Sequence, residues 1–532
     1  MTERATVAAL ALFAVALALD VTGIDWGLPS AERSRHVPRD PHWYAAPQTA
    51  ARLYETAPYE SYNPDEGALL DALSHMRPRA LDLNPHYFNY PTLWIYATGA
   101  ALAGASATGR VRLENAKSFY LGHPEAMAAI YRVGRLLAAS FAAVGVVVLF
   151  VAVRTLFDVP TAVFSASALA VTPLWVRDAH FMLINVPAAV LMIACAALAA
   201  RALAGGSTAA LVASGFAAGL AASTKYPAGA VVAVPLVVGA LRDRRSRGWT
   251  VLVIGAAAGL GFFAGTPYAL LAPHEALAGI AFEAHDKSGL ASTGLVGSQL
   301  VLAQGTALAC LALAGLGLAF VHVRDARYGL VLVWVAAGLA QRLVSGADPL
   351  RYVILALPAL AVCAGLSLAA VRRACGGRAL GTVVALLLLV PALGFALDVD
   401  RVLCEPDVRT VAAGWVAERT PAGETVAIPG NLYFDMPPLD AERQTIVDLR
   451  TAEAEDASLA VVPSTRLALA QPWLGGRAAV AVFRQGPLAA WTWPVEARPS
   501  DWAFTFLDVY VFGRTSTAPL RGARVTEVTG AP

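Results

Sequence analysis

The chain has 532 residues, of which 57% are hydrophobic and 15% are charged, and its formal net charge at pH 7 is +2. Soluble domains carry about 25% charged residues, so this composition argues against an ordinary soluble globular protein. The net charge is small and no long run of lysine and arginine lies beside aromatic residues, which excludes a typical nucleic-acid-binding protein.

Apolar segments of about 20 residues, the length that a transmembrane helix needs, recur from the N-terminus to about residue 397. They lie at 5–20, 127–153, 159–177, 183–203, 208–223, 226–241, 249–270, 297–321, 328–345, 351–371 and 379–397. The first segment has no clear small-residue cleavage site after it, so we interpret it as an uncleaved span. The pattern predicts an α-helical polytopic membrane protein with about 11 transmembrane helices.

The orientation of these spans follows from the basic turns between them, because lysine and arginine in short loops favour the cytoplasm. With eleven spans and a cytoplasmic N-terminus, every basic turn lies inside, including the arginine cluster at 242–247. Counting the shorter apolar stretch 91–106 as a further span would move each basic turn from Arg154 onward to the outside. We therefore expect 91–106 to be an interfacial helix within one large external loop, residues 21–126.

The last part of the chain has the composition of a soluble protein. Residues 398–532 contain 17 acidic residues, 12 arginines and no lysine, a net charge of −5. Strands are expected at Thr425–Ile428, Thr445–Leu449, Leu459–Val462 and Val509–Phe512, and a helix at Val408–Arg419. We predict two domains, a transmembrane domain at 1–397 and a small extracytoplasmic α/β domain at 398–532.

The first external loop contains two adjacent acids in the sequence Asn63-Pro64-Asp65-Glu66-Gly67. Adjacent carboxylates at a membrane surface can deprotonate an acceptor hydroxyl or hold a divalent metal. A structural interpretation competes with this one. Asn63 is a good N-cap, Pro64 suits the first helical position and Glu66 completes a capping box. The local pattern favours the structural interpretation and leaves the catalytic one open.

Other polar residues gather where the spans are expected to reach the outer side. Arg177–His180 forms a polar turn, and Asn185 begins the next span. Lys225 lies at another outer end, where a lone lysine can simply snorkel to the interface. Arg351 lies at a third, and arginine suits bidentate phosphate binding. The aromatic segment Asn84–Pro91 can serve as an interfacial anchor or line a lipid or sugar site.

These segments, in this order, resemble the membrane glycosyltransferases of the C-type fold, and most of all the superfamily of protein O-mannosyltransferases and aminoarabinose transferases (glycosyltransferase family 39). The resembling segments are Pro64-Asp65-Glu66, Asn84–Tyr96, Tyr131–Leu137, Ala179–Phe181 with Asn185, Gly219–Pro227, Gly265–Tyr268, and Arg351-Tyr352 with Pro358. Together they cover most of residues 1–370.

The resemblance implies transfer of a sugar from a polyprenyl-phosphate donor to a protein, glycan or lipid acceptor outside the cytoplasm, with inversion at the anomeric carbon. It implies a multi-pass protein of the cell membrane. Asp65 would be the catalytic base and Glu66 its helper, while Lys225, Arg351 and Tyr352 would face the donor phosphate. His86, Tyr90, His180 and Asn185 would contact the substrates.

No cofactor is certain from the sequence, and a divalent metal, Mg²⁺ or Mn²⁺, stays open with Asp65 as a ligand. Two residues depart from the family pattern. Relatives often carry an acid at the position of Asn185, and a histidine or lysine at the position of Tyr90. The first departure weakens a metal site made of two acids.

Two other classes of function compete with the enzyme. A transporter or lipid flippase would need charged or broken helices near the middle of the membrane. No internal repeat is evident, and the polar groups gather at the outer ends of the spans, which weighs against it. A non-catalytic scaffold whose tail binds a partner would tolerate replacement of Asp65, and an enzyme would not.

Overall fold

The structure is a computed structural model. It describes residues 3–34, 59–242, 247–286, 289, 292–375, 377–430, 434–440, 442–475, 479–486, 498–513 and 527–528. The chain divides into two compact units. The helical unit contains Met1–Thr22, Leu69–Ala101 and Gly134–Asp400, and the mixed unit contains Gly23–Ala68, Leu102–Val133 and Arg401–Pro532. The mixed unit thus joins parts of the predicted external loop to the predicted soluble domain.

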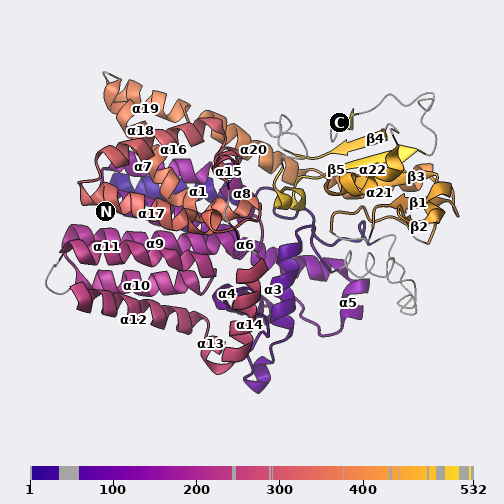
Figure 1. Ribbon diagram of the computed structural model, residues 1–532, viewed down its shortest axis with the longest axis horizontal. Coiled ribbons are helices and arrows are strands. Elements are labelled where there is room, and N and C mark those ends of the chain that lie inside the picture. Colours follow the sequence, from indigo (N-terminus) through magenta and orange to yellow (C-terminus); the bar gives the residue numbers. More distant parts are fainter. Residues whose placement is uncertain are drawn as a thin grey trace. The chain divides into compact units, whose positions relative to one another are not determined.

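Helices make up nearly all of the helical unit (Figure 1). The longer ones are α1 Glu3–Val21, α4 Leu93–Ala107, α6 Pro124–Leu156, α7 Val159–Ala170, α8 Pro173–Ala179, α9 Asn185–Gly205, α10 Thr208–Ala222, α11 Ala233–Arg242, α12 Arg247–Gly265, α14 Pro273–Asp286, α15 Thr293–Gln304, α16 Thr306–Val321, α17 Ala326–Leu343, α18 Leu357–Ala374, α19 Arg378–Leu387 and α20 Val390–Cys404. Shorter turns are η2 Pro78–Ala80, α13 Tyr268–Leu271 and the 3₁₀ helices η3 Tyr226–Val232 and η4 Leu350–Ala356.

Each of the eleven predicted apolar runs is helical in the structure, but several of them are broken. The run at 159–177 bends by 60° between α7 and α8, where Pro173 starts a new helix. The run at 297–321 bends by 118° at Gly305, whose φ of +76° ends α15. Among the described residues, six helices are long and apolar enough to span a membrane, or up to eight when each bent pair is one span. The count of eleven spans stays a prediction.

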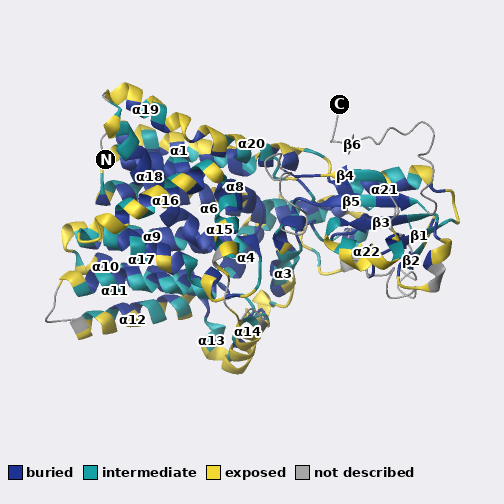
Figure 2. Ribbon diagram, turned by 45° about the horizontal axis from the view of Figure 1, so that its top comes forward, coloured by how far each residue is buried: buried dark blue, intermediate teal, exposed yellow. Residues whose placement is uncertain are grey.

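Burial differs strongly among these helices (Figure 2). The span that includes α18 is 94% buried inside the protein, whereas the span of α12 is only 17% buried. The exposed face of α12 carries large apolar side chains, among them Trp249, Leu252 and Leu260. Exposed apolar area on this scale is expected of a surface that faces lipid.

Small residues allow the helices of this unit to pack closely. A Cβ atom at Gly219 of α10 would collide with the carbonyl oxygen of Ala258 in α12, and one at Gly315 of α16 would collide with that of Cys363 in α18. In lipid, where no hydrophobic force drives helices together, close backbone contact of this kind supplies van der Waals attraction.

The mixed unit contains a six-stranded sheet with the order β2-β1-β3-β5-β4-β6. The strands are β1 Thr425–Ile428, β2 Thr445–Asp448, β3 Leu459–Pro463, β4 Ala479–Arg484, β5 Asp508–Gly513 and β6 Glu527–Val528. Its other elements are α3 Pro64–Ser74, which continues into the helical unit, α5 Lys117–Gly122, α21 Val408–Arg419, α22 Leu467–Leu474, and the 3₁₀ helices η5 Ala452–Asp456, η6 Ser464–Arg466 and η9 Ser500–Phe504. The strand β1 pairs in parallel with β2 and β3, while β5 is antiparallel to β3 and β4.

The sheet is buried on both faces by apolar side chains. Val426, Val461 and Val509 pack against Ala412 and Val416 of α21 on one face. On the other face, residues of β1 and β3 pack against α22. The four predicted strands and the helix 408–419 are confirmed to within a residue, and β4 and β6 are strands that the sequence reasoning missed.

Candidate functional site

Lys225 lies where α10 has ended and the 3₁₀ helix η3 begins. Its backbone is extended, with φ −152° and ψ 119°, and it is the N-cap residue of η3. Its side chain is only 7% exposed, and Nζ donates a hydrogen bond of 2.7 Å to Oδ1 of Asn185. A lysine that snorkels would send its ammonium group outward, whereas this one is held inside the helical unit.

Asn185 continues the polar chain from Lys225. It is the first residue of α9, and its Nδ2 donates to Oδ2 of Asp178 at 3.4 Å. Asp178 in turn forms an ion pair of 2.7 Å with Arg177, and both side chains are almost fully buried. Two residues that the sequence placed in separate segments, Asn185 and Lys225, are therefore direct partners.

Three cations surround the ring of Tyr352, which is 3% exposed. The Nζ atom of Lys225 lies 5.4 Å from the ring centroid, and the Cζ atoms of Arg342 and Arg351 lie 5.7 and 5.9 Å from it. These distances are in the range of cation–π attraction. We call Lys225, Arg342, Arg351 and Tyr352 the cation cluster.

Arg342 is the member that the sequence reasoning missed, because it lies inside a predicted span. Its side chain is fully buried, and Nη2 donates to the backbone oxygen of Ser345. Its Nε and Nη1 atoms are buried and have no hydrogen-bond partner among the described residues. An arginine within a membrane segment is itself a signal of function and could have been singled out.

Further charged residues interact with members of the cation cluster. Lys225, Arg342 and Arg351 are accompanied by Arg177, while the carboxylates are Asp178 and Asp348, the second of which interacts electrostatically with Arg342. Arg342 is fully buried among them, and two of its nitrogens have no hydrogen-bond partner among the described residues. Buried cations with donors left over are costly unless an anion accepts from them. The arrangement can bind a phosphate group.

The second predicted feature, the pair of acids, lies in the mixed unit. Asn63 caps α3, because its Oδ1 accepts from the backbone N–H of Asp65 at 3.2 Å. Ser61 Oγ accepts from the N–H of Asn63 at 3.1 Å and donates to Glu66 Oε2 at 2.5 Å. The predicted cap at Asn63 is confirmed, but Glu66 reaches the N–H of Asn63 through Ser61 and not by the direct bond of a capping box. We call Ser61, Asn63, Asp65 and Glu66 the acid turn.

The two acids of the acid turn have different surroundings. Glu66 is fully buried and bonded to Ser61, so it stabilises the turn. Asp65 is partly exposed, at the second helical position, where a negative charge interacts favourably with the helix dipole. Of the two, Asp65 is the one whose carboxylate can meet a reactant. Its catalytic role and the helper role of Glu66 stay predictions.

The other predicted site residues have contacts of their own. His86, with a φ of +49°, pairs through Nδ1 with Glu275 of α14 at 2.9 Å, and both side chains are about half exposed. Tyr90 packs edge-on against Tyr87, with ring centroids 5.6 Å apart. Neither of these contacts involves the cation cluster. The substrate-binding roles expected of His86 and Tyr90 stay predictions.

His180 is buried at the end of α8. Its Nδ1 lies 2.7 Å from the carbonyl oxygen of Val176, and its Nε2 lies 2.8 Å from that of Thr22. Burial lowers the pKa of His180 to about 4, outweighing the two carbonyl oxygens, which favour the protonated ring. A neutral imidazole can donate to only one of these two carbonyl oxygens, so His180 has one hydrogen bond of this kind in its enclosed position. Its predicted contact with substrate stays a prediction.

A metal site requires several ligands at one place. Within the described ranges, no group of three or more histidine, cysteine, aspartate or glutamate side chains is arranged to hold an ion. Glu66 already accepts from Ser61, and Mg²⁺ prefers six oxygen ligands in octahedral geometry. The acid turn by itself does not fit a metal, and no step of the proposed reaction requires one.

A comparison with known protein families gives a match to part of this chain. Residues 131–241 match the sequence profile of the dolichyl-phosphate-mannose-protein mannosyltransferase family. This match confirms the resemblance to the protein O-mannosyltransferase superfamily over a segment that includes Arg177, Asn185 and Lys225. A comparison with curated protein sequences gives no significant match.

Several solved structures align with much of this chain. The Archaeoglobus fulgidus oligosaccharyltransferase tethered to an acceptor peptide has a TM-score of 0.49 at 12% identity, with 86% of this chain and 69% of that chain covered. ArnT from Cupriavidus metallidurans has a TM-score of 0.47 at 17% identity in the apo state, with 97% and 99% covered. Its complex with undecaprenyl phosphate has a TM-score of 0.45 at 15% identity, with 96% and 98% covered. At these scores the likeness does not define the chemistry of this chain.

Proposed function

We propose that this chain is a membrane glycosyltransferase that moves a sugar from a polyprenyl-phosphate donor to an acceptor on the extracytoplasmic side, with inversion at the anomeric carbon. The observation that carries the proposal is the cation cluster. Its buried arginine, Arg342, has two donors without a partner in the part of the chain that the structure describes, and these could bind an anion. The family match over 131–241 supports the same class of enzyme.

The chemistry assigns a distinct part to each group. Asp65 accepts the proton of the acceptor hydroxyl as its oxygen attacks the anomeric carbon. The bond between that carbon and the phosphate oxygen breaks, and its electron pair stays on the leaving phosphate. Lys225, Arg342 and Arg351 stabilise the negative charge that develops there, and cations fixed in place before the reaction are effective in this role. Glu66 holds the acid turn through Ser61.

The test uses purified protein and a panel of polyprenyl-phosphate sugars, with release of polyprenyl phosphate as a readout that does not depend on which sugar is moved. Asp65→Asn keeps the Asn63 cap and loses a dipole interaction of about 0.3–1 kcal/mol. Loss of a general base lowers the rate by about a hundredfold to ten-thousandfold. The matched control is Asp71→Asn, which replaces an exposed acid of the same helix.

The proposal expects Asp65→Asn to melt like the parent and to release polyprenyl phosphate at least a hundredfold more slowly, while Asp71→Asn is unaffected. An Asp65→Asn protein that melts normally and transfers sugar at the parental rate would remove Asp65 from catalysis. A parent protein that binds no polyprenyl phosphate would overturn the assignment of the cation cluster.

A further inference from the structure

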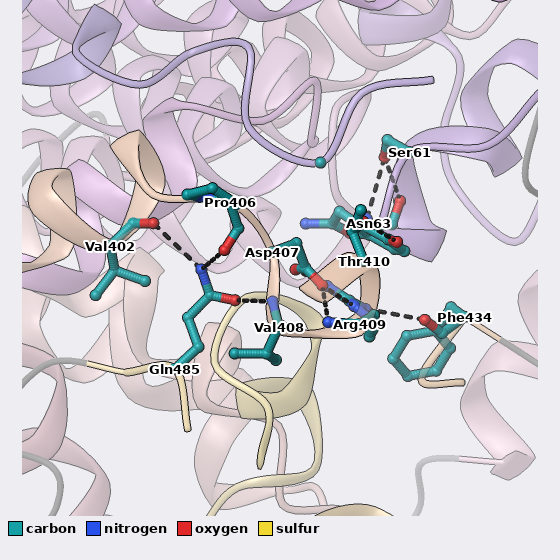
Figure 3. Close-up of polar contacts among 12 residues, drawn as sticks. Ser61, Asn63, Val402, Pro406, Asp407, Val408, Arg409, Thr410, Phe434 and Gln485 are labelled. Carbon is teal, nitrogen blue, oxygen red and sulfur yellow. Dashed lines mark hydrogen bonds and ion pairs between the residues drawn. The ribbon is translucent and has the colours of Figure 1, made fainter. Parts of the chain in front are cut away.

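The segment that leads into the acid turn is fixed against the C-terminal part of the mixed unit. Tyr62, directly before the capping residue Asn63, is 4% exposed, and its hydroxyl lies 2.9 Å from Oγ1 of Thr410 in α21. Figure 3 shows Ser61 and Asn63 beside Thr410 and Arg409. The two hydroxyls come from residues 348 positions apart in the sequence, so only the fold brings them together.

Two guanidinium groups enclose the ring of Tyr62. The Cζ atoms of Arg33 and Arg409 each lie 3.7 Å from the ring centroid. Two planar groups at that distance cannot occupy the same face, so the ring lies between them. A stack of this kind, desolvated on both sides, is favourable for cation and ring alike. We call Arg33, Tyr62, Arg409 and Thr410 the tyrosine clamp.

Both arginines of the clamp are held in place by other groups. Arg409 pairs with both oxygens of Asp407 at 2.7 Å, and its Nη1 donates to the carbonyl oxygen of Phe434 at 2.9 Å (Figure 3). Arg33 donates from Nη1 to the carbonyl oxygens of Gly27 and Glu60 at 2.8 and 3.0 Å. With its guanidinium fixed in this way, each arginine allows the ring little freedom.

The start of α21 is anchored as well. Oε1 of Gln485 accepts from the N–H of Val408 at 3.0 Å, and its Nε2 donates to the carbonyl oxygens of Val402 and Pro406 at 3.4 Å (Figure 3). The side chain of Gln485 is 4% exposed. Residues of the soluble tail therefore hold α21, α21 carries Arg409 and Thr410, and these two hold Tyr62.

The clamp transmits this restraint to the first acid. Ser61, on one side of Tyr62, bonds to Glu66, and Asn63, on the other side, caps α3 and accepts from the N–H of Asp65. The direction of α3 at its N-terminus, and with it the position of the Asp65 carboxylate, is thus set by contacts on both sides of Tyr62.

We propose that the tyrosine clamp is a positioning device through which the C-terminal domain holds Asp65 in its reactive orientation. The proposal rests on the function proposed above. Tyr62, Arg409 and Thr410 touch no reacting atom in it and act through the acid turn. The soluble tail then contributes to the rate of transfer without contacting the sugar donor.

The variants remove one contact at a time. Tyr62→Phe and Thr410→Val each delete one side of the hydroxyl pair and keep the packing, Arg409→Gln deletes the charge, and Arg409→Lys keeps it. The matched control is Arg419→Gln, which removes a more exposed cation that lies over Trp415 on the same helix. Misplacement of a catalytic group by about 1 Å can cost about a hundredfold in rate.

We expect kcat to fall by about tenfold to a hundredfold in Arg409→Gln, and less in Tyr62→Phe and Thr410→Val. The KM for the donor and the binding of polyprenyl phosphate should stay at parental values. Arg409→Lys should recover part of the rate, and Arg419→Gln should match the parent. In an Asp65→Asn background, Arg409→Gln should cause no further loss of kcat, because the carboxylate that the clamp positions is already absent.

Parental kcat in a folded Arg409→Gln protein would overturn the proposal. So would a loss that multiplies with that of Asp65→Asn, which would mean a role independent of the acid. Failure of the proposed function would give a different result. Asp65→Asn alone would then keep its activity, whatever the activities of the clamp variants. Should Arg409→Gln fail to fold, Tyr62→Phe and Thr410→Val decide the question.

Discussion

Replacing Arg342 with methionine should move affinity and stability in opposite directions. The guanidinium is fully buried within the cation cluster, and two of its nitrogens have no partner among the described residues. Methionine is similar in length and apolar, so it fills the space without the charge. If Arg342 binds the donor phosphate, its replacement should leave the stability of the ligand-free protein nearly unchanged. The same replacement should weaken binding of the donor.

The expected magnitudes follow from the contacts. A hydrogen bond to a charged group contributes about 1.5–3 kcal/mol, so loss of the Arg342 contact should weaken polyprenyl phosphate binding roughly 10- to 150-fold. An unsatisfied buried donor costs about 1–3 kcal/mol, and this cost disappears in Arg342→Met. The lost bond to Ser345 and the contact with Tyr352 offset part of the gain. The melting temperature should stay level or rise.

The assay titrates purified protein with polyprenyl phosphate and follows both binding and the melting temperature. The uncharged polyprenol serves as a control ligand, and the parent and the variant should bind it equally. Arg327→Met is the matched protein control, since Arg327 lies at the other end of α17, is about half exposed and pairs with Asp325. Arg327 also donates to the backbone oxygen of Leu156 and lies over Phe157, so its replacement should lower the melting temperature slightly and leave affinity unchanged.

If Arg342 only stabilises the fold and binds no phosphate, the two measurements should change in the opposite way. In that case Arg342→Met melts at a lower temperature because it loses Ser345 and Tyr352, while polyprenyl phosphate binds as tightly as to the parent. That pair of measurements would refute the assignment of Arg342 to a phosphate site. It would also leave Lys225 and Arg351 as cations that need another explanation.

Two further predictions concern pH and topology. Native His180 stays neutral down to a pKa of about 4, whereas an unfolded histidine titrates near 6.5, so the part of the stability that depends on His180 should be lost as the pH falls from about 6.5 towards 4. His180→Gln should flatten that part of a melting-temperature profile against pH, and an unchanged slope would contradict the burial argument. Epitope tags at the exposed turns Gly206 and Gly423 should be detected on the cytoplasmic and external sides respectively. Detection of both tags on one side would refute the eleven-span topology.

Much of the fold could be predicted because its causes are local. The apolar runs gave the positions of the helices, since a run of about 20 apolar residues has few other uses. The helix Val408–Arg419 and four strands followed from periodicity and were found to within a residue. The cap at Asn63 follows from residues within one turn. Breaks at Pro173 and Gly305 carried a local signal that the hydropathy pattern obscured.

What the tertiary structure alone decided is which distant residues meet. Lys225 and Asn185 are 40 residues apart, and Tyr62 and Thr410 are 348 apart, so no local pattern relates them. The sequence identified Asp65, Lys225 and Arg351 as candidates. Arg342 carried a local signal, an arginine within an apolar run, but its contact with the buried ring of Tyr352 and its two donors without partners among the described residues are visible only in the structure. Hydropathy and capping act between near neighbours, whereas a charge cluster or a clamp exists only once the chain has packed.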